Sequence, residues 1–408
     1  MAEHRTMSDD ELRERTRTLL EEVHPERDDS VTFRRKQYEH GLAWVHFPEG
    51  HGGLGLSPKM NVVVHDEITR HSSVVHHDPP ASIIGIGMGA PVVLTYGSEE
   101  MKQRLLPRIF SGEEVWCQLF SEPSAGSDVA GLATRAVRDG DDWVLNGQKV
   151  WTTVAHLARW GMLIARTNPD VPKHDGLSYF VLDMHAPGVE VRPLYQITGE
   201  AEFNEVFLTD VRIPHDQMLG KEGQGWRVAI TTLMNERVAI GSGGSKRKGG
   251  GSIGQVLKLW QSRQPGAHSP AQEAILRDRV TQCWVESELL RITGQRARAS
   301  QKAGNPGPEG SVSKLAGAEA AKRMWETALD LMGNDGLSFE AGYELRQSAG
   351  RAETPEALAK YQFLRSRANS IEGGTSEIMR NILGERVLGL PGEPRVDKEI
   401  AWKDVPRS

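Results

Sequence analysis

The chain has 408 residues, of which 25% are charged, with a formal net charge of −6 and an isoelectric point near 6.2. This length predicts two or three domains with sizeable cores. The acidic balance argues against nucleic acid as a main partner. There is no signal-peptide pattern and no apolar run of about 18 residues, and Cys117 and Cys283 form no metal or disulfide motif. We therefore expect a soluble, cytoplasmic protein without metal and without membrane contact.

Helical patterns dominate the first region, residues 1–115. Asp9–Val23 and Met60–His71 carry apolar residues at helical spacing. Ser98, followed by two glutamates, begins a third helix in the manner of a capping box. A glycine-rich loop at 48–56 lies between them. This region is predicted to be an N-terminal helical domain.

The pattern changes to period two in residues 116–224, which predicts strands. The turn residues Asp139–Asp142 join two alternating runs into a hairpin. We expect this region to form an antiparallel β-barrel or sandwich. The strand-like runs are 134–138, 143–145, 160–165, 177–182 and 205–208.

Helical patterns return in residues 225–390, and residues 391–408 are expected to form a C-terminal tail. The Gly- and Ser-rich segment 241–252 predicts a flexible loop, and Gly304–Gly310 predicts a break between helices. The fold class is therefore α+β multidomain, with a helical bundle after the barrel. The predicted helices of this bundle are 226–241, 273–302, 313–332 and 356–367.

Two sequence motifs indicate a ligand-binding site. The first is Ser121-Glu-Pro-Ser-Ala-Gly-Ser-Asp128, followed by Asn146–Thr153, and the second is Glu372-Gly-Gly-Thr-Ser-Glu-Ile-Met-Arg380. Hydroxyls and glycines suit a backbone that approaches a flat, phosphate-bearing ligand closely. In this order, the motifs resemble those of the acyl-CoA dehydrogenases. The resemblance covers residues 30–390, and segments 41–56 and 96–107 share it.

The resemblance implies an α–β–α fold with FAD as cofactor, in a dimer or a homotetramer. Phe120 and Ser121 would lie along the flavin ring, and Ser127 would hydrogen-bond the pyrophosphate. Trp151 would pack against the flavin, and Thr153 would contact the flavin N5 region. Three further residues would reach the FAD of a neighbouring subunit: Gly374, Thr375 and Glu377.

The reaction that the resemblance implies removes the α-proton of an acyl thioester, so it needs a carboxylate as general base in a pocket that excludes water. In many family members this glutamate directly precedes Gly-Thr, where this chain has Gly373. The favoured base is Glu236, on the helix after the barrel. The adjacent residues Glu236-Arg237 resemble the Glu-Arg sequence that carries the base in isovaleryl-CoA and long-chain acyl-CoA dehydrogenases. Glu372, one residue out of register, is the alternative base. Gly373 would donate its backbone N–H to the thioester oxygen, and Arg237 would contact coenzyme A phosphates or serve the structure.

Three weaker patterns were weighed against plain structural roles. Segment 83–90 nearly fits a dinucleotide-binding fingerprint, but we expect a tightly packed glycine-rich helix instead. The histidines at 71–78 lack metal-ligand spacing and are expected to form a solvated loop. Segment 330–336 departs from the family's adenosine contact, so its role in FAD binding stays open.

The resemblance thus implies FAD-dependent α,β-dehydrogenation of an acyl-CoA to the trans-2-enoyl-CoA, as in fatty acid β-oxidation. Electrons would pass to an electron-transferring flavoprotein. One alternative is an acyl-CoA oxidase that uses O2. Because a glycine replaces the usual base, a non-catalytic subunit of a hetero-oligomeric dehydrogenase also stays open. The acyl chain length, branching and ring content are not indicated.

Overall fold

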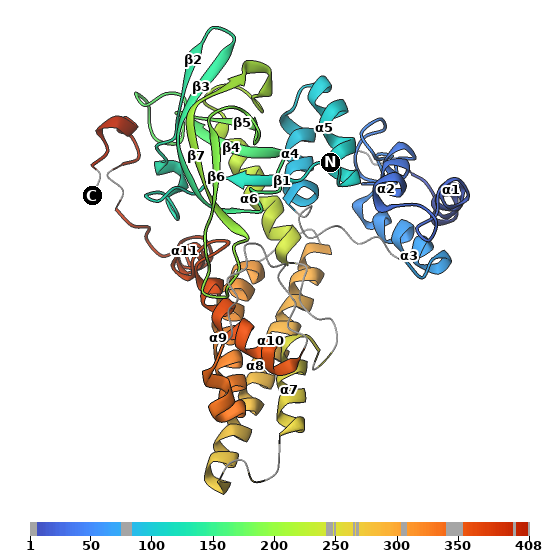
Figure 1. Ribbon diagram of the computed structural model, residues 1–408, viewed down its shortest axis with the longest axis vertical. Coiled ribbons are helices and arrows are strands. Elements are labelled where there is room, and N and C mark those ends of the chain that lie inside the picture. The colour runs from blue at the N-terminus through green and yellow to red at the C-terminus, as the bar shows by residue number, and fades with distance from the viewer. Residues whose placement is uncertain are drawn as a thin grey trace. The chain divides into compact units, whose positions relative to one another are not determined.

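The computed structural model describes residues 6–74, 84–241, 248, 250–263, 266, 269–302, 308–339, 354–394 and 397–406. Its elements follow the predicted order, helical, then β, then helical (Figure 1). The chain forms two compact units. The first unit comprises Met1–Pro193, Phe203–Ala239 and Val396–Ser408. The second comprises Leu194–Glu202 and Ile240–Arg395.

The first unit begins with helices α1 (Asp9–Glu22), α2 (Ser30–Glu39) and α3 (Asn61–His71). Ser8 and Glu11 form a reciprocal capping box at the start of α1. The apolar stripes of these helices meet in one core, which confirms the helices predicted at 9–23 and 60–71. Helix α2 was not predicted, because its apolar pattern is weak. Buried members of this core are Leu12, Leu19, Phe33, Val63, Val64 and Ile68.

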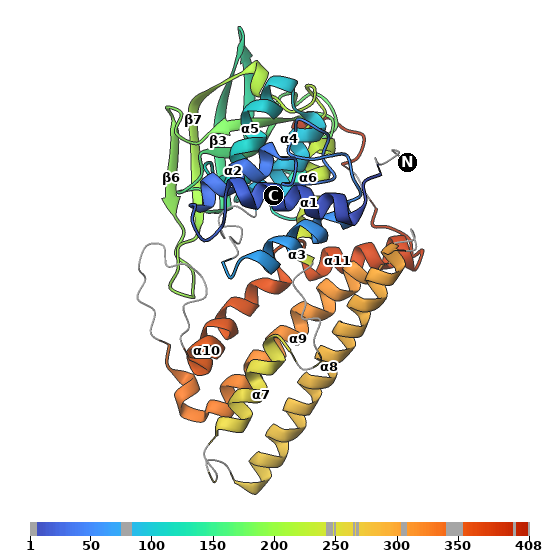
Figure 2. The ribbon, with the colours of Figure 1, turned by 90° about the vertical axis from the view of Figure 1, so that its right-hand side faces the viewer.

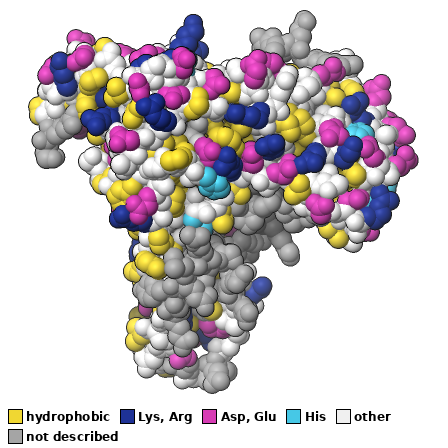
Figure 3. Space-filling view, turned by 45° about the horizontal axis from the view of Figure 1, so that its top comes forward, with side chains coloured by type: hydrophobic (Ala, Val, Ile, Leu, Met, Phe, Trp, Pro, Cys, Tyr) yellow, Lys and Arg dark blue, Asp and Glu magenta, His cyan; other side chains and the backbone are white. Residues whose placement is uncertain are grey.

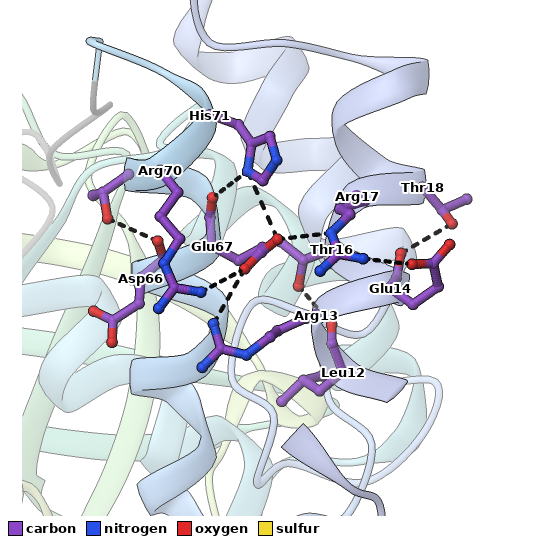
Figure 4. Close-up of polar contacts among 11 residues, drawn as sticks. Leu12, Arg13, Glu14, Thr16, Arg17, Thr18, Asp66, Glu67, Arg70 and His71 are labelled. Carbon is purple, nitrogen blue, oxygen red and sulfur yellow. Dashed lines mark hydrogen bonds and ion pairs between the residues drawn. The ribbon is translucent and has the colours of Figure 1, made fainter. Parts of the chain in front are cut away.

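A buried carboxylate joins α1 to α3 (Figure 4). The Glu67 side chain is only 2% exposed, and it accepts hydrogen bonds from Arg13 at 3.2 Å and Arg17 at 2.8 Å on α1. Arg70, one turn further along α3, adds a third bond at 3.2 Å. Burial raises the pKa of Glu67, but the bonds from Arg17 and Arg13 outweigh it and hold the pKa below its ordinary value.

We predict that Glu67→Gln lowers the free energy of unfolding by about 2 kcal/mol, because the amide lacks the negative charge and keeps only one of the two oxygens that accept from the arginines. The folded carboxyl has the lower pKa, so its contribution is complete above about pH 4.3, the unfolded value, and is lost as the pH falls through the folded pKa. Urea unfolding at pH 7 and at pH 3 checks both statements. An equal loss in the variant at both pH values would contradict the electrostatic account.

A glycine-rich helical segment packs against the sheet. A π-turn at Gly85–Gly89 continues into α4 (Ala90–Tyr96), and α5 (Glu99–Ser111) follows. A side chain at Gly89 would lie 3.2 Å from the Trp116 ring, a tight contact, so the close approach favours glycine. The expected packed helix is confirmed, and the glycines of the dinucleotide fingerprint lie within this helix rather than in a turn before a helix.

The middle region forms one seven-stranded sheet with the order β1-β4-β2-β3-β7-β6, and β5 pairs with β4. Most pairs are antiparallel, but β1 and β2 both pair with β4 in parallel, so the sheet is mixed rather than purely antiparallel as expected. Strand β6 was not predicted. The strands are β1 (Trp116–Leu119), β2 (Arg135–Asp139), β3 (Asp142–Thr153), β4 (Trp160–Arg166), β5 (Leu177–Asp183), β6 (Val189–Pro193) and β7 (Phe203–Pro214).

Both faces of the sheet are buried at β4 and β5, because alternate residues of each strand enter different cores. On β4, Met162 and Ile164 belong to the core that the sheet shares with α4, α5 and α6 (Gly225–Gly241). Leu163 and Ala165 belong to a second core on the opposite face of the sheet. The same alternation runs along β5, where Tyr179 faces the helices. Helix α6 therefore lies against the face of the sheet on which Tyr179 lies.

The second unit is a helical bundle, in which α9 packs against α7, α8 and α10 (Figure 2). Its core includes Val256, Cys283, Met324, Trp325 and Ala359. All four helices predicted after the barrel are confirmed, as α6, α8, α9 and α10, although most of α6 belongs to the first unit. Helices α7 and α11 are additional. The helices are α7 (Ser252–Ser262), α8 (Pro270–Lys302), α9 (Glu309–Met332), α10 (Pro355–Arg365) and α11 (Ser376–Ile382).

Several expectations concern residues that the structure does not describe. Most of the predicted loop 241–252 and of the break 304–310 lies outside the described residues, as do His76, His77 and Asp78. Among the helices that are described, none is long and apolar enough to cross a membrane. Within the same residues, no group of three or more His, Cys, Asp or Glu side chains could hold a metal ion. On the face shown in Figure 3, acidic and basic side chains are interspersed.

Candidate active site

The two segments that are predicted to hold the flavin, Ser121–Asp128 and Asn146–Thr153, lie side by side in the first unit. Strand β1 delivers Phe120 to a buried position and Ser121 to a half-buried one. The backbone N–H of Val150 on β3 donates to the Ser121 carbonyl at 2.9 Å. Residues that are distant in the sequence are thereby held in contact, as the resemblance implied.

A buried ion pair fastens these segments together. Lys149 is fully buried and donates to the Phe120 carbonyl at 3.1 Å and to Glu122 at 2.9 Å. Glu122 also accepts from the backbone N–H groups of Ala133 and Thr134, at 2.7 and 2.9 Å. Burial lowers the pKa of Lys149, whereas the pKa of Glu122 is lowered because the Lys149 charge and these amides outweigh burial. The pair sets the path of the chain around Ser121.

Trp151 has an unusual backbone and an exposed ring. Its φ is +58°, its side chain is 57% exposed, and its ring meets Phe203 edge-on at 5.9 Å. The pairing of β3 with β7 shifts register between Lys149 and Thr152, so a bulge redirects this part of the strand. Thr153, two residues further on, is half-buried. A strained, exposed tryptophan is typical of a functional surface.

The turn after Ser121 presents polar groups to solvent. Ser127 and Asp128 are exposed, and Lys173 donates to both carboxylate oxygens of Asp128 at 2.9 and 2.8 Å. A side chain placed at Gly126 would meet no atom within 4 Å, so the surface around it is open. Ser127 therefore lies on an accessible turn with polar neighbours.

Helix α6 is tied to the flavin segment through Tyr179. The rings of Phe120 and Tyr179 meet edge-on at 5.8 Å, and the Tyr179 hydroxyl lies 3.0 Å from that of Thr232 on α6. Residue 236 follows Thr232 by one helical turn. The side chains of Glu236 and Arg237 lie outside the described residues, so their predicted roles remain predictions.

The second motif lies in the second unit and forms a tight turn before α11. Gly373 and Gly374 have φ values of +61° and +92°, which favour glycine. Thr375 caps α11 by accepting from the backbone N–H of Ile378 at 3.2 Å. Lys314 donates to the carbonyls of Asn369 and Gly374 and so fastens the turn to α9.

The two glutamates of this motif are both ion-paired. Glu372 accepts two bonds from Arg365, at 3.0 and 2.8 Å. Glu377 is exposed and pairs with Arg380 at 3.1 Å. Both oxygens of Glu372 are engaged by Arg365, so the side chain would have to leave this partner to reach a substrate, and this geometry disfavours Glu372 as the base.

The sequence analysis did not identify a pair of buried or half-buried glutamates in the second unit, Glu200 and Glu202, which lie beside Tyr361. The Tyr361 hydroxyl donates to the buried Glu200 at 3.0 Å, and burial followed by the charge of Glu200 raises the pKa of Glu202. No local pattern indicates this group, because 200–202 and 361 are distant in the chain. Lys149, by contrast, stands at a core-facing position of β3 in phase with Trp143 and Leu145, and a lysine at such a position signals a buried partner.

Segment 330–336, whose role stayed open, lines a cavity of about 320 Å³ in the second unit. Asp330 pairs with Arg279 of α8 across this cavity. Gly336 is buried, and a side chain there would lie 2.7 Å from the Leu329 carbonyl, so the turn packs tightly on α9. The other lining residues are Glu326, Leu329, Gly333, Leu337 and Phe363.

Three family models match the chain almost end to end. They are described as the N-terminal, middle and C-terminal domains of acyl-CoA dehydrogenase, and they match residues 2–113, 117–211 and 223–388. The chain belongs to the acyl-CoA dehydrogenase family. The family resemblance of the two motifs is thereby confirmed, as is its helical–β–helical fold.

Named relatives support the same assignment. Acyl-CoA dehydrogenase IpdE1 of Mycobacterium tuberculosis is 38% identical over 357 residues, which cover 87% of this chain and 86% of that protein. Acyl-CoA dehydrogenase FadE34 of the same organism is also 38% identical, over 86% of this chain but only 45% of that protein. Among solved structures, the ChsE4–ChsE5 complex from Mycobacterium tuberculosis contains a chain with 26% identity and a TM-score of 0.69, covering 96% of this chain and 100% of that one.

FAD is the cofactor of an acyl-CoA dehydrogenase, and the described residues fit it. The open turn at Ser127 offers a hydroxyl to phosphate oxygens. Trp151 presents a flat ring, and Ser121 and Thr153 add hydroxyls on the adjoining segments. Hydroxyl donors and an exposed aromatic ring are the groups that a flavin with a pyrophosphate needs. This enzyme of the acyl-CoA dehydrogenase family thus holds a donor set that suits FAD.

Proposed function

We propose that this enzyme removes the α-proton and the β-hydride of an acyl-CoA thioester and releases a trans-2-enoyl-CoA. The observation that carries the proposal is the exposed Trp151, with its positive φ, held beside the Ser121 turn by the buried Lys149–Glu122 pair. This arrangement, within a chain of the acyl-CoA dehydrogenase family, supports a flavin site that takes up the hydride. When bound, FAD supplies the hydride acceptor.

The chain's own residues supply the proton chemistry and the orientation. Glu236 is the proposed base, because residue 236 lies on α6 one turn after Thr232, which reaches Tyr179 and through it Phe120. The backbone N–H of Gly373 is proposed to donate to the thioester oxygen, which makes the α-proton more acidic. Arg237 is proposed to contact the coenzyme A phosphates or to support the helix.

Cofactor contacts are proposed for both motifs. Phe120, Ser121, Ser127, Trp151 and Thr153 would hold the flavin and its pyrophosphate. The turn at Gly374, Thr375 and Glu377 would approach the FAD of a second subunit, which requires a dimer or a tetramer. The domain boundaries 1–115, 116–224, 225–390 and 391–408 are kept as part of this proposal.

Electrons are proposed to leave through an electron-transferring flavoprotein rather than through O2. The relatives at 38% identity bear the name dehydrogenase, which supports this acceptor. The test supplies the reduced enzyme with either acceptor under matched conditions. Reoxidation that is at least tenfold faster with the flavoprotein supports the proposal, and rapid reoxidation by O2 with release of hydrogen peroxide would identify an oxidase instead.

A second candidate is a subunit that needs a different partner chain for activity. Two observations favour it: Gly373 occupies the position where many family members carry the base, and a structural neighbour is described as a complex of two chains, ChsE4 and ChsE5. Light scattering and flavin content of the isolated chain separate the candidates. A homo-oligomer that retains FAD supports the first, and a chain that retains FAD only after co-expression with a second chain supports this one.

A further inference from the structure

The last described residues of the chain return to the β region. They lie against the turn at residues 126–132, which contains Ser127 and is called the flavin turn below. This C-terminal strap, residues 397–406, belongs to the first unit and is drawn in dark red beside the sheet in Figure 1. It lies beyond residue 388, where the family match ends. The strap itself therefore lies outside the matched family domains, whereas the residues that it contacts lie in the middle domain, residues 117–211.

Backbone hydrogen bonds fix the register of the strap. The N–H of Trp402 donates to the Val171 carbonyl at 2.9 Å, and the N–H of Lys403 donates to the Pro169 carbonyl at 3.0 Å. A short 3-10 turn, Trp402–Asp404, follows. Two consecutive backbone bonds to one loop hold the Trp402 ring in a defined place.

The Trp402 ring covers a buried arginine that organises the flavin turn. The Arg166 guanidinium lies 4.1 Å from the ring centroid. Arg166 is buried and donates to the carbonyls of Ala130 at 2.7 Å and Leu132 at 3.1 Å. The indole N–H of Trp402 donates to the Gly131 carbonyl at 3.3 Å. Three consecutive carbonyls, at 130, 131 and 132, are thus held by Trp402 and the arginine beneath it.

The start of the strap reaches the same turn through a lysine. Lys173 is only 5% exposed, and it forms ion pairs with Asp128 of the flavin turn and with Asp397 of the strap. Burial opposes its charge, but the two carboxylates outweigh burial and raise the pKa of Lys173. Asp397 therefore helps to keep Lys173 charged and fixed where it holds Asp128, the residue next to Ser127.

We infer that the C-terminal strap is a positioning element for the cofactor: it fixes the turn 128–132 and thereby holds Ser127 in place for the FAD pyrophosphate. The inference rests on the proposed role of Ser127. Asp397 and Trp402 act on FAD through Lys173 and Arg166, without touching the cofactor. A turn that is ordered before FAD arrives loses less conformational entropy on binding, so the affinity is higher.

The test compares variants of the full-length chain by the dissociation constant for FAD, measured by flavin fluorescence during titration of the apoprotein. We expect Trp402→Ala to weaken FAD binding by about tenfold or more. Asp397→Asn should weaken it less, and Trp402→Phe, which keeps a ring over Arg166, should lie close to wild type. Lys403→Ala is the matched control, because it removes only an exposed ion pair with Asp170 in the same strap.

Hydrogen exchange and thermal unfolding of the apoprotein complete the test. We expect the amides of 128–132 to exchange faster in Trp402→Ala. If Trp402→Ala and Asp397→Asn lower the apoprotein melting temperature but leave FAD affinity unchanged, the strap is only structural and the inference is wrong. Should Trp402→Ala fail to fold, Asp397→Asn decides the question in the same way, because it keeps the Trp402 ring and removes only the charge of Asp397 beside Lys173. A wild-type chain that takes up no FAD would instead overturn the proposed function, on which the inference rests.

Discussion

Replacing Glu236 with glutamine is expected to slow substrate-dependent flavin reduction by about 10²- to 10⁴-fold, the usual contribution of one general base. The change keeps the size of the side chain and removes only the proton acceptor. FAD binding and acyl-CoA binding should therefore change little. The measurement is anaerobic stopped-flow mixing with an acyl-CoA that the wild type accepts, followed at the flavin absorbance band.

Glu372→Gln is the matched control for that experiment. The same chemical change is made at the alternative base, whose carboxylate is already held by two bonds from Arg365. We expect the rate to fall less than about tenfold, because this side chain is engaged elsewhere and stands one residue out of register. A dead Glu372→Gln enzyme beside a normal Glu236→Gln enzyme would place the base on the turn before α11.

The second large effect is expected at the buried ion pair beneath the flavin segments. Lys149→Met should lower the free energy of unfolding by about 3–5 kcal/mol, because it leaves the Glu122 carboxylate buried without its countercharge. The variant should also retain less FAD, since Lys149 holds the Phe120 carbonyl. Urea unfolding and the flavin content after gel filtration measure the two effects separately.

A double variant sharpens this prediction. Combining Lys149→Met with Glu122→Gln removes both charges and keeps one acceptor oxygen, which can serve only one of the two amides, Ala133 or Thr134, that bind separate oxygens of Glu122. It should be more stable than Lys149→Met alone, because no unpaired charge remains in the core. If the loss of stability in the double variant instead equals the sum of the losses measured in Lys149→Met and in Glu122→Gln, the two side chains do not interact as described.

The sequence indicated much of the fold because local patterns agreed with the final packing. Residues 9–22 combine a capping box with an apolar stripe, and β4 and β5 are apolar runs between turns, so both types of element were recognisable. Strand β6 was missed because Val189–Pro193 is short and its alternation weak. Helix α7 was missed because glycines precede it and its apolar face is defined by packing against α9.

The parallel pairing of β1 with β4 could not be predicted, because strand order depends on contacts between distant segments. The candidate site shows the same division. The motifs around Ser121 and Glu372 were visible, since each is contiguous in the chain. The Tyr179–Thr232 link and the Trp402 contact with Arg166 were not, because each joins residues far apart in sequence.

The central claim, a flavin-dependent acyl-CoA dehydrogenase, is tested most directly with the purified wild-type chain. The chain is incubated with FAD, passed through gel filtration and titrated anaerobically with straight-chain, branched and ring-bearing acyl-CoAs. We predict that stoichiometric FAD stays bound and that at least one thioester bleaches the flavin with formation of the matching trans-2-enoyl-CoA. A chain that retains no flavin, or a bound flavin that no acyl-CoA reduces, would contradict the account.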